Sequence, residues 1–183
     1  MPCAACGRKK GGVNFPAPEL LNQPQTTTWG PALWKMLHAF AERVGKNPII
    51  PLQLDEVREL EILVRSFPQT LPCPTCQRHA AEYLQSHPLG WAKLRGAAVA
   101  PEARRWFYDF HDHVNQQKAS GISTSPAYEL LETLYGGPLV NIAADFDIFA
   151  EELGRAVNFN WVKHEASVKV RRHLTTLRRL MGI

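Results

Sequence analysis

Long apolar runs are missing from this chain of 183 residues. No stretch approaches the roughly 18 consecutive apolar residues of a membrane-spanning helix, so we expect no membrane span. The first residues, MPCAACGRKKGGVNF, also lack the apolar centre of a secretory signal peptide, which favours a soluble protein that stays where it is made. An alternating apolar–polar pattern is absent too, and this argues against β-sheet and thioredoxin-like βαβ architectures.

Cysteine is scarce, and its few positions are informative. The chain has four cysteines in two pairs of identical spacing, Cys3–Cys6 and Cys73–Cys76. No cysteine follows Cys76, which excludes a disulfide within the C-terminal part. In a protein without a secretion signal, Cys-x-x-Cys indicates redox chemistry or metal binding more often than a structural disulfide.

Helical periodicity of apolar residues, bounded by proline and glycine, predicts an all-α fold. We expect helices at about residues 29–44, 55–66, 74–86, 101–118, 126–136, 141–153 and 162–180, with Thr28 as the first N-cap and a connection over 67–72. The organisation predicted is a flexible N-terminal arm over residues 1–27, a helical domain over 28–137 and a helical C-terminal extension over 138–183.

The Cys73–Cys76 pair lies at the predicted start of a helix, because Pro74 suits the first helical position. A helix N-terminus favours thiolate over thiol, which suits thiol–disulfide exchange. We expect Cys73 to be the exposed sulfur and Cys76, one turn further on, to be the buried one. A zinc knuckle and two unrelated buried thiols are the alternatives that this motif leaves open.

Two further pairs lie four residues apart and so share a helix face. Trp34 and His38 form one pair, and His111 and Asn115 form the other. The second pair adjoins an apolar stripe with Val114, so the two groups are suited to a flat heteroaromatic ligand. Taken singly, each pair is more typical of a core aromatic and a hydrogen-bonded core histidine.

Taken together, the three elements are far more specific. The order Trp-Gly-x-x-x-Trp-x-x-Leu-His, Pro-Cys-x-x-Cys and His-x-x-Val-Asn resembles the Erv/ALR family of FAD-dependent sulfhydryl oxidases over about residues 28–120. The likeness is greatest to copies carried by large DNA viruses. It implies a four-helix bundle cradling FAD, a short fifth helix and a homodimer. If the chain is viral, the host cytoplasm or the virion is the expected location.

The resemblance also implies roles for individual residues. Cys73 would exchange disulfides with the substrate, and Cys76 would lie against the flavin and form the charge-transfer thiolate. The implied cofactor-binding residues are Trp29, Gly30, Trp34, His38, Cys76, His111, Val114 and Asn115, with Lys118 nearest to the lysines that usually approach the FAD phosphates.

Several positions depart from the family pattern. Pro31 replaces an arginine, Val44 a tyrosine and Asp112 an asparagine. Gln117 and Ser120 occupy the usual lysine positions, with Lys118 shifted by one. The phosphate contacts are therefore the least defined part of the predicted site.

The N-terminal pair Cys3–Cys6 admits three interpretations. It is a shuttle that carries electrons from substrate thiols to Cys73–Cys76, half of a four-thiolate zinc site, or a pair of exposed thiols with no role. The zinc interpretation would consume the catalytic pair, so it excludes the shuttle.

The net charge of +4 comes from the tail, since residues 162–183 hold six of the 21 Lys and Arg but one of the 17 Asp and Glu. We expect an amphipathic helix there whose charges form a solvated face. Packing on the domain, a dimer interface or contact with nucleic acid are the other possibilities, with nucleic acid disfavoured.

The chain is thus predicted to oxidise protein dithiols with FAD and to reduce molecular oxygen to hydrogen peroxide. The alternative is a zinc-stabilised binding module that contacts nucleic acid through its basic tail.

Overall fold

The computed structural model describes residues 22–117, 125–138 and 140–183. Within these residues it contains α-helices and short 3-10 helices but no strand, which confirms the all-α prediction. No helix in the described ranges is long and apolar enough to cross a membrane.

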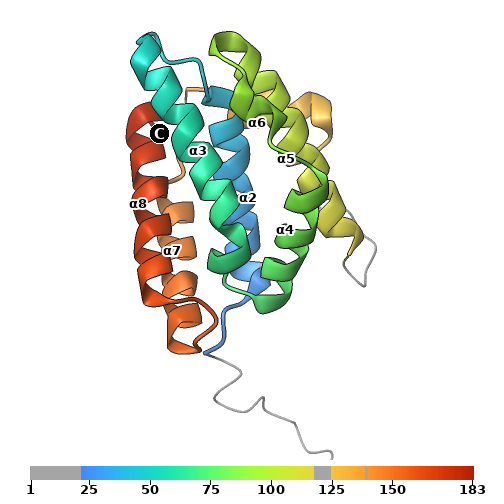
Figure 1. The fold of residues 1–183 in the computed structure, drawn as a ribbon, viewed down its shortest axis with the longest axis vertical. Helices are drawn as coiled ribbons and strands as arrows, with labels where there is room; N and C mark the ends of the chain where they lie inside the picture. The colour runs from blue at the N-terminus through green and yellow to red at the C-terminus, as the bar shows by residue number, and fades with distance from the viewer. Residues whose placement is uncertain (1–21, 118–124, 139) are drawn as a thin grey trace, which may run out of the picture.

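Four helices form the bundle that the sequence predicts (Figure 1). They are α2 (Thr26–Arg43), α3 (Ile50–Thr70), α4 (Pro74–Ser86) and α5 (Val99–Gln116). Two 3-10 turns, η1 (Gly90–Lys93) and η2 (Gly96–Ala98), connect α4 to α5. Helix α2 lies in the middle, with α3 and α5 on either side of it (Figure 1).

Helix α3 is longer at both ends than the sequence predicted, and the expected connection over residues 67–72 was wrong for most of its length. Pro51 lies in the first turn, where its missing N–H leaves no hydrogen bond unmade. Pro68 lies in the last turn, so the helix continues to Thr70 despite it. Proline therefore marked neither boundary.

Helix α2 also begins earlier than predicted, and Thr28 is not its N-cap. The carbonyl of Gln25 accepts hydrogen bonds from the N–H groups of Thr28 and Trp29, which makes Gln25 the N-cap. The predicted end is confirmed, since Gly45 follows the C-cap with φ +77°. The Gly45 N–H donates to the buried Glu56 carboxylate at 2.8 Å and so ties this turn to α3.

The predicted fifth helix is shorter than expected and consists of η3 (Tyr128–Leu130) and α6 (Leu131–Tyr135). Arg43, the last residue of α2, holds α6 in place. Its guanidinium donates to the carbonyl oxygens of Tyr135 and Gly137, both at 2.6 Å. This clamp brings the side chain of Tyr135 against α2.

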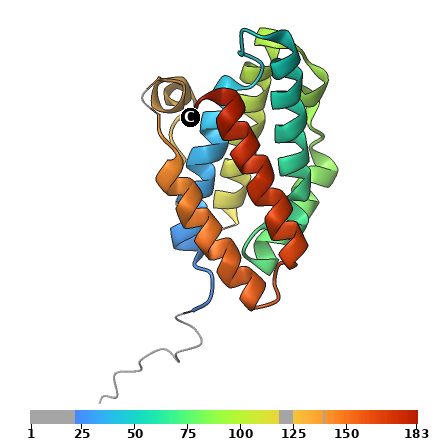
Figure 2. The same cartoon turned by 90° about the vertical axis from the view of Figure 1, so that its left-hand side faces the viewer.

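The C-terminal extension folds back on the bundle as two helices, α7 (Ala143–Asn158) and α8 (His164–Met181). Helix α7 packs against α2 and α8 against α3. Figure 2 shows the two helices side by side on this face of the molecule. Phe149, Leu153, Leu174 and Leu177 are fully or almost fully buried and belong to the same core as the bundle.

The basic side chains of α8 do not all form a solvated face. Arg172 and Arg179 are exposed as expected. In contrast, Arg171 donates to the carbonyl of Ala150 in α7 at 2.6 Å, and Arg178 lies over the ring of Phe146. Val168 is 51% exposed and so lies outside the buried face of α8. The extension is therefore attached to the core by polar as well as apolar contacts.

We expect Leu174→Ala to lower the free energy of unfolding by about 2–5 kcal/mol, because the buried side chain leaves a cavity between α8 and α3. Val168→Ala, on the exposed side of the same helix, should change it by less than about 0.5 kcal/mol. Urea unfolding of the full chain measures both. A Leu174→Ala loss no larger than that of the control would contradict the packing of α8.

Candidate active site

The Cys73–Cys76 pair forms a disulfide at the N-terminus of α4. Cys73 is the N-cap, Pro74 is the first helical residue, and the backbone N–H of Cys76 donates to the Cys73 Sγ at 3.1 Å. This places Cys73 Sγ at the positive end of the helix dipole, where a thiolate is favoured. The local sequence thus folds into the helix start that we predicted.

Exposure does not distinguish the two sulfurs as the sequence suggested, because both cysteines are half-buried. The cavity beside the disulfide does distinguish the two sulfurs. Cys76 lines it, whereas Cys73 does not. Cys76 is therefore the sulfur of the pair that a group bound in the cavity could contact.

The cavity has a volume of about 650 Å³, which is typical of a site for a cofactor or a small ligand. It lies between α2, the end of α3, the start of α4, and α5, with α6 closing one side. Its wall is largely apolar and aromatic. The lining residues are Thr26, Thr27, Trp29, Gly30, Pro31, Leu33, Trp34, Lys35, Leu37, Phe67, Leu71, Thr75, Cys76, His79, Phe110, His111, Val114, Gln117, Pro126 and Tyr135.

The two predicted pairs on α2 and α5 meet in a cluster of stacked rings. The ring of Trp34 stacks on that of His111, with centroids 4.0 Å apart and planes 9° apart. His38 Nε2 lies 3.1 Å from His111 Nδ1, so one histidine donates to the other. Spacing along single helices could not show that these pairs, 73 residues apart, lie in contact.

His38 lies behind the cavity wall, where it orients His111. It is 1% exposed, and this burial lowers its pKa to about 4. The imidazole is therefore neutral at physiological pH. Tyr135 stacks on its other side, with centroids 5.2 Å apart.

Six of the predicted site residues line the cavity: Trp29, Gly30, Trp34, Cys76, His111 and Val114. Asn115 is buried outside the lining, and its side-chain amide donates to Ser125 Oγ at 2.7 Å. Lys118, Cys3 and Cys6 lie outside the described residues.

Most of the other lining residues were missed by sequence reasoning, and two of them, Tyr135 and Lys35, bear on the chemistry of the cavity. Tyr135 comes from α6, and its position depends on the Arg43 clamp, which no local pattern shows. Lys35 follows Trp34 and forms an ion pair with Asp145 of α7 at 2.7 Å. Lys35 could have been found from the sequence, because it is a cation within the Trp-Gly motif. The helical spacing from Trp34 indicates the direction of its side chain.

The disulfide between Cys73 and Cys76 differs from the state that a zinc site would require. Tetrahedral zinc with four cysteines requires each sulfur as a thiolate. In the structure, Cys73 and Cys76 are bonded to each other instead. The described residues also contain no group of three or more His, Cys, Asp or Glu side chains placed to hold a metal ion. The state of the pair in the structure is thus a disulfide, and Cys3 and Cys6, the other half of the zinc alternative, lie outside the described residues.

A model of the Erv1/Alr family matches residues 31–128, more than half of the chain. Protein 347L of Invertebrate iridescent virus 6 is 31% identical over 88 residues, which cover 48% of this chain and 76% of that protein. Protein 096R of Invertebrate iridescent virus 3 is 33% identical over 88 residues, which cover 48% of this chain and 53% of that protein. Both are named as candidate FAD-linked sulfhydryl oxidases.

The FAD-linked sulfhydryl oxidase of African swine fever virus is 29% identical over 89 residues, which cover 49% of this chain and 66% of the viral protein. The chain thus spans only about half to three quarters of these relatives' length. No solved structure matches it significantly. Helices α6, α7 and α8 all lie outside the segment that the family model matches.

We expect His38 to stay neutral down to about pH 4, and this can be followed by NMR titration of its imidazole, assigned with a His38→Asn variant. The folded state then binds the proton more weakly than the unfolded chain, whose histidine pKa is about 6.5. Stability is therefore complete above about pH 6.5 and falls as the pH drops towards 4, by roughly 3 kcal/mol from this group. A titration midpoint near 6.5 in the folded protein would contradict the burial of His38.

Proposed function

Because the chain belongs to the Erv1/Alr family, we propose that it is a FAD-dependent sulfhydryl oxidase that oxidises protein dithiols to disulfides and reduces molecular oxygen to hydrogen peroxide. The observation that carries this proposal is the meeting of a redox disulfide with an aromatic cavity. One sulfur of the pair, that of Cys76, forms part of the cavity wall.

The residues of the cavity fit FAD in size and in chemistry. The volume of about 650 Å³ suits a large ligand, and the rings of Trp34 and His111 offer flat surfaces to an aromatic group. Trp29 also lines the cavity, and its buried Nε1 has no hydrogen-bond partner among the described residues. Burying such a donor is costly unless a partner is supplied, and a polar atom of the cofactor would supply it.

Individual roles follow from these positions. Trp29, Gly30, Trp34, His111 and Val114 would contact FAD directly. His38 and Asn115 would act from behind, by orienting His111 and by fixing the end of α5. Gln117 lines the cavity where the family resemblance expects a lysine, and Lys35 is the one Lys or Arg in the described lining.

The first half of the reaction is thiol–disulfide exchange at the helix N-terminus. A substrate thiolate attacks Cys73 Sγ, which breaks the Cys73–Cys76 bond, forms a mixed disulfide and releases Cys76 as a thiolate. The second substrate thiolate then attacks the substrate sulfur of the mixed disulfide and releases Cys73. The substrate leaves as a disulfide, and its two electrons remain on the Cys73–Cys76 dithiol.

The second half returns the pair to a disulfide. FAD, when bound, accepts two electrons from a dithiol and passes them to oxygen. The protein's part is to hold the Cys76 sulfur at the cavity wall and to stabilise thiolates at the start of α4, where the Cys76 N–H points at Cys73 Sγ. No separate acid–base pair is needed for thiolate attack.

The role of the N-terminal cysteines, the homodimer and the location of the protein are predictions from the family resemblance. Cys3 and Cys6 would relay electrons from protein substrates, and the chain would form a homodimer. The relatives above are viral, so a cytoplasmic or virion location would follow for a viral copy.

We expect Cys73→Ser and Cys76→Ser each to lower dithiothreitol oxidation about a hundredfold or more, whereas Gln85→Ala, at the far end of α4, should leave it unchanged. Because Cys73 lies outside the cavity lining, we expect the Cys76→Ser variant to form a mixed disulfide at Cys73 with oxidised glutathione, located by peptide mass spectrometry. The Cys73→Ser variant should form far less at Cys76. Equal labelling of the two sulfurs, or full turnover without Cys73, would contradict these roles.

A further inference from the structure

Gln77, the residue after Cys76, links the redox motif to the C-terminal extension. Its backbone N–H donates to the Cys73 carbonyl at 2.9 Å. Its side-chain amide donates to the carbonyl of Leu71, just before the motif, at 2.8 Å and to the carbonyl of Trp161 at 3.0 Å. One side chain therefore holds together the segment that enters the motif and the turn between α7 and α8.

The α7–α8 turn (residues 159–163) is a fixed structure. Asn160 adopts φ 57°, and the N–H groups of Trp161 and Val162 both donate to the carbonyl of Ala156. Val162 is 3% exposed and anchors the turn in the core. A turn held by its own hydrogen bonds, a buried anchor and Gln77 presents its remaining side chains in a defined position.

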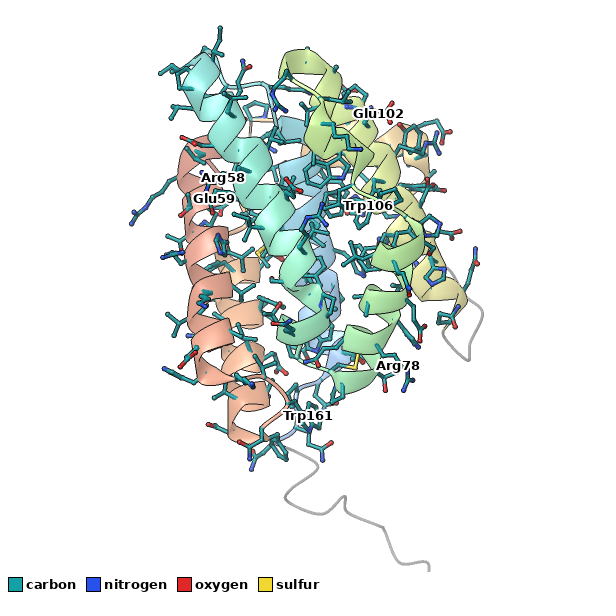
Figure 3. All side chains as sticks on the ribbon, viewed as in Figure 1. Arg58, Glu59, Arg78, Glu102, Trp106 and Trp161 are labelled. Carbon is teal, nitrogen blue, oxygen red and sulfur yellow. A yellow bond between two sulfur atoms is a disulfide. The ribbon has the colours of Figure 1, made fainter. Side chains whose placement is uncertain are left out.

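The side chains so presented are aromatic. Phe159 and Trp161 are half-buried, and their ring centroids lie 5.5 Å apart. Trp161, Cys73 and Cys76 are all partly buried and pack against the hydrophobic core. Figure 3 shows Trp161 at the end of the molecule where α4 begins, close to Arg78. The two aromatic rings thus form partly exposed apolar surface on the turn whose backbone Gln77 joins to the redox motif.

We propose that the α7–α8 turn is one wall of the surface on which protein substrates present their thiols to Cys73, and that it favours substrates with an apolar side chain next to the cysteine. This inference rests on the proposed function and names the substrate class for the same disulfide. The occupant is fixed by the chemistry, because the attacking thiolate must reach Cys73 Sγ and its neighbouring residues must then lie beside the motif. Tryptophan at the centre of such a contact contributes strongly to binding.

Peptide specificity tests the proposal. Two reduced peptides with the same Cys-x-x-Cys pair, one flanked by leucines and the other by serines, are oxidised by the full-length holoenzyme and by its Trp161→Ala variant. We expect the wild type to prefer the leucine peptide about tenfold in kcat/KM and Trp161→Ala to lose that preference. Dithiothreitol, which needs no docking surface, should be oxidised within twofold of the wild-type rate.

Two further variants guard against a folding defect at Trp161. Phe159→Ser removes the second ring. Gln77→Ala removes the hydrogen bond that holds the turn to the motif but leaves the turn's own sequence unchanged, so both variants should reduce the preference. Ile50→Ser is the matched control. Ile50 is 69% exposed at the start of α3, about 30 Å of helix away from the motif, and its loss should change nothing.

The possible outcomes distinguish a failure of the proposed oxidase function from a failure of the docking surface. A wild-type protein that oxidises no dithiol at all overturns the proposed function. An active enzyme without a leucine preference, or one whose Trp161→Ala variant keeps it, overturns the docking surface alone. The variants are also made in a Cys3→Ser/Cys6→Ser background, where the same loss is expected. A loss that requires Cys3 and Cys6 would mean that the turn receives the chain's own arm, and this would overturn the proposal too.

Discussion

The structure depends on the burial of helix α2 from both sides. Every residue from Met36 to Glu42 is buried, so the middle of this helix has no solvent-facing side. On one side it meets α5 across the cavity, and on the other it packs against α7. Burial favours pairing of the polar groups in this stretch within the protein, although His38 Nδ1 has no hydrogen-bond partner among the described residues. Glu42 accepts hydrogen bonds from Arg104 of α5, and His38 meets His111.

This enclosure places the chemistry. Because α2 is fixed on both sides, Trp34 can hold His111 in a stack, and Arg43 can hold α6 so that Tyr135 closes the cavity. The disulfide lies at the other end of the same cavity wall, where α3 passes into α4. The extension therefore supports the cofactor site through α7 and reaches the redox motif through the α7–α8 turn and Gln77. Parts of the chain outside the matched family segment thus shape both ends of the site.

The sequence predicted the elements that local physics controls. Pro74 after Cys73 indicated a helix start, and the structure has Cys73 as its N-cap. Four-residue spacing put Trp34 with His38 and His111 with Asn115, but only the family resemblance suggested that the two pairs meet around one ligand.

Contacts that arise from tertiary packing were not predictable in this way. Tyr135 shows no local signal. Residues 50–54 and 67–70 were placed outside the second helix, but α3 includes Pro51 in its first turn and Pro68 in its last turn. The sequence also could not predict which helix α8 packs against. An amphipathic pattern identifies the apolar face of a helix but not the surface that covers this face.

The proposed function requires a flavin in the cavity, in electronic contact with the Cys73–Cys76 pair. The most direct measurement is the visible absorption spectrum of the purified full-length protein, recorded without oxygen before and after excess dithiothreitol and again after oxygen is admitted. We expect a yellow protein whose flavin bands bleach with dithiol and recover with oxygen. A colourless protein that takes up no FAD, or a bound flavin that dithiol leaves oxidised, would contradict it.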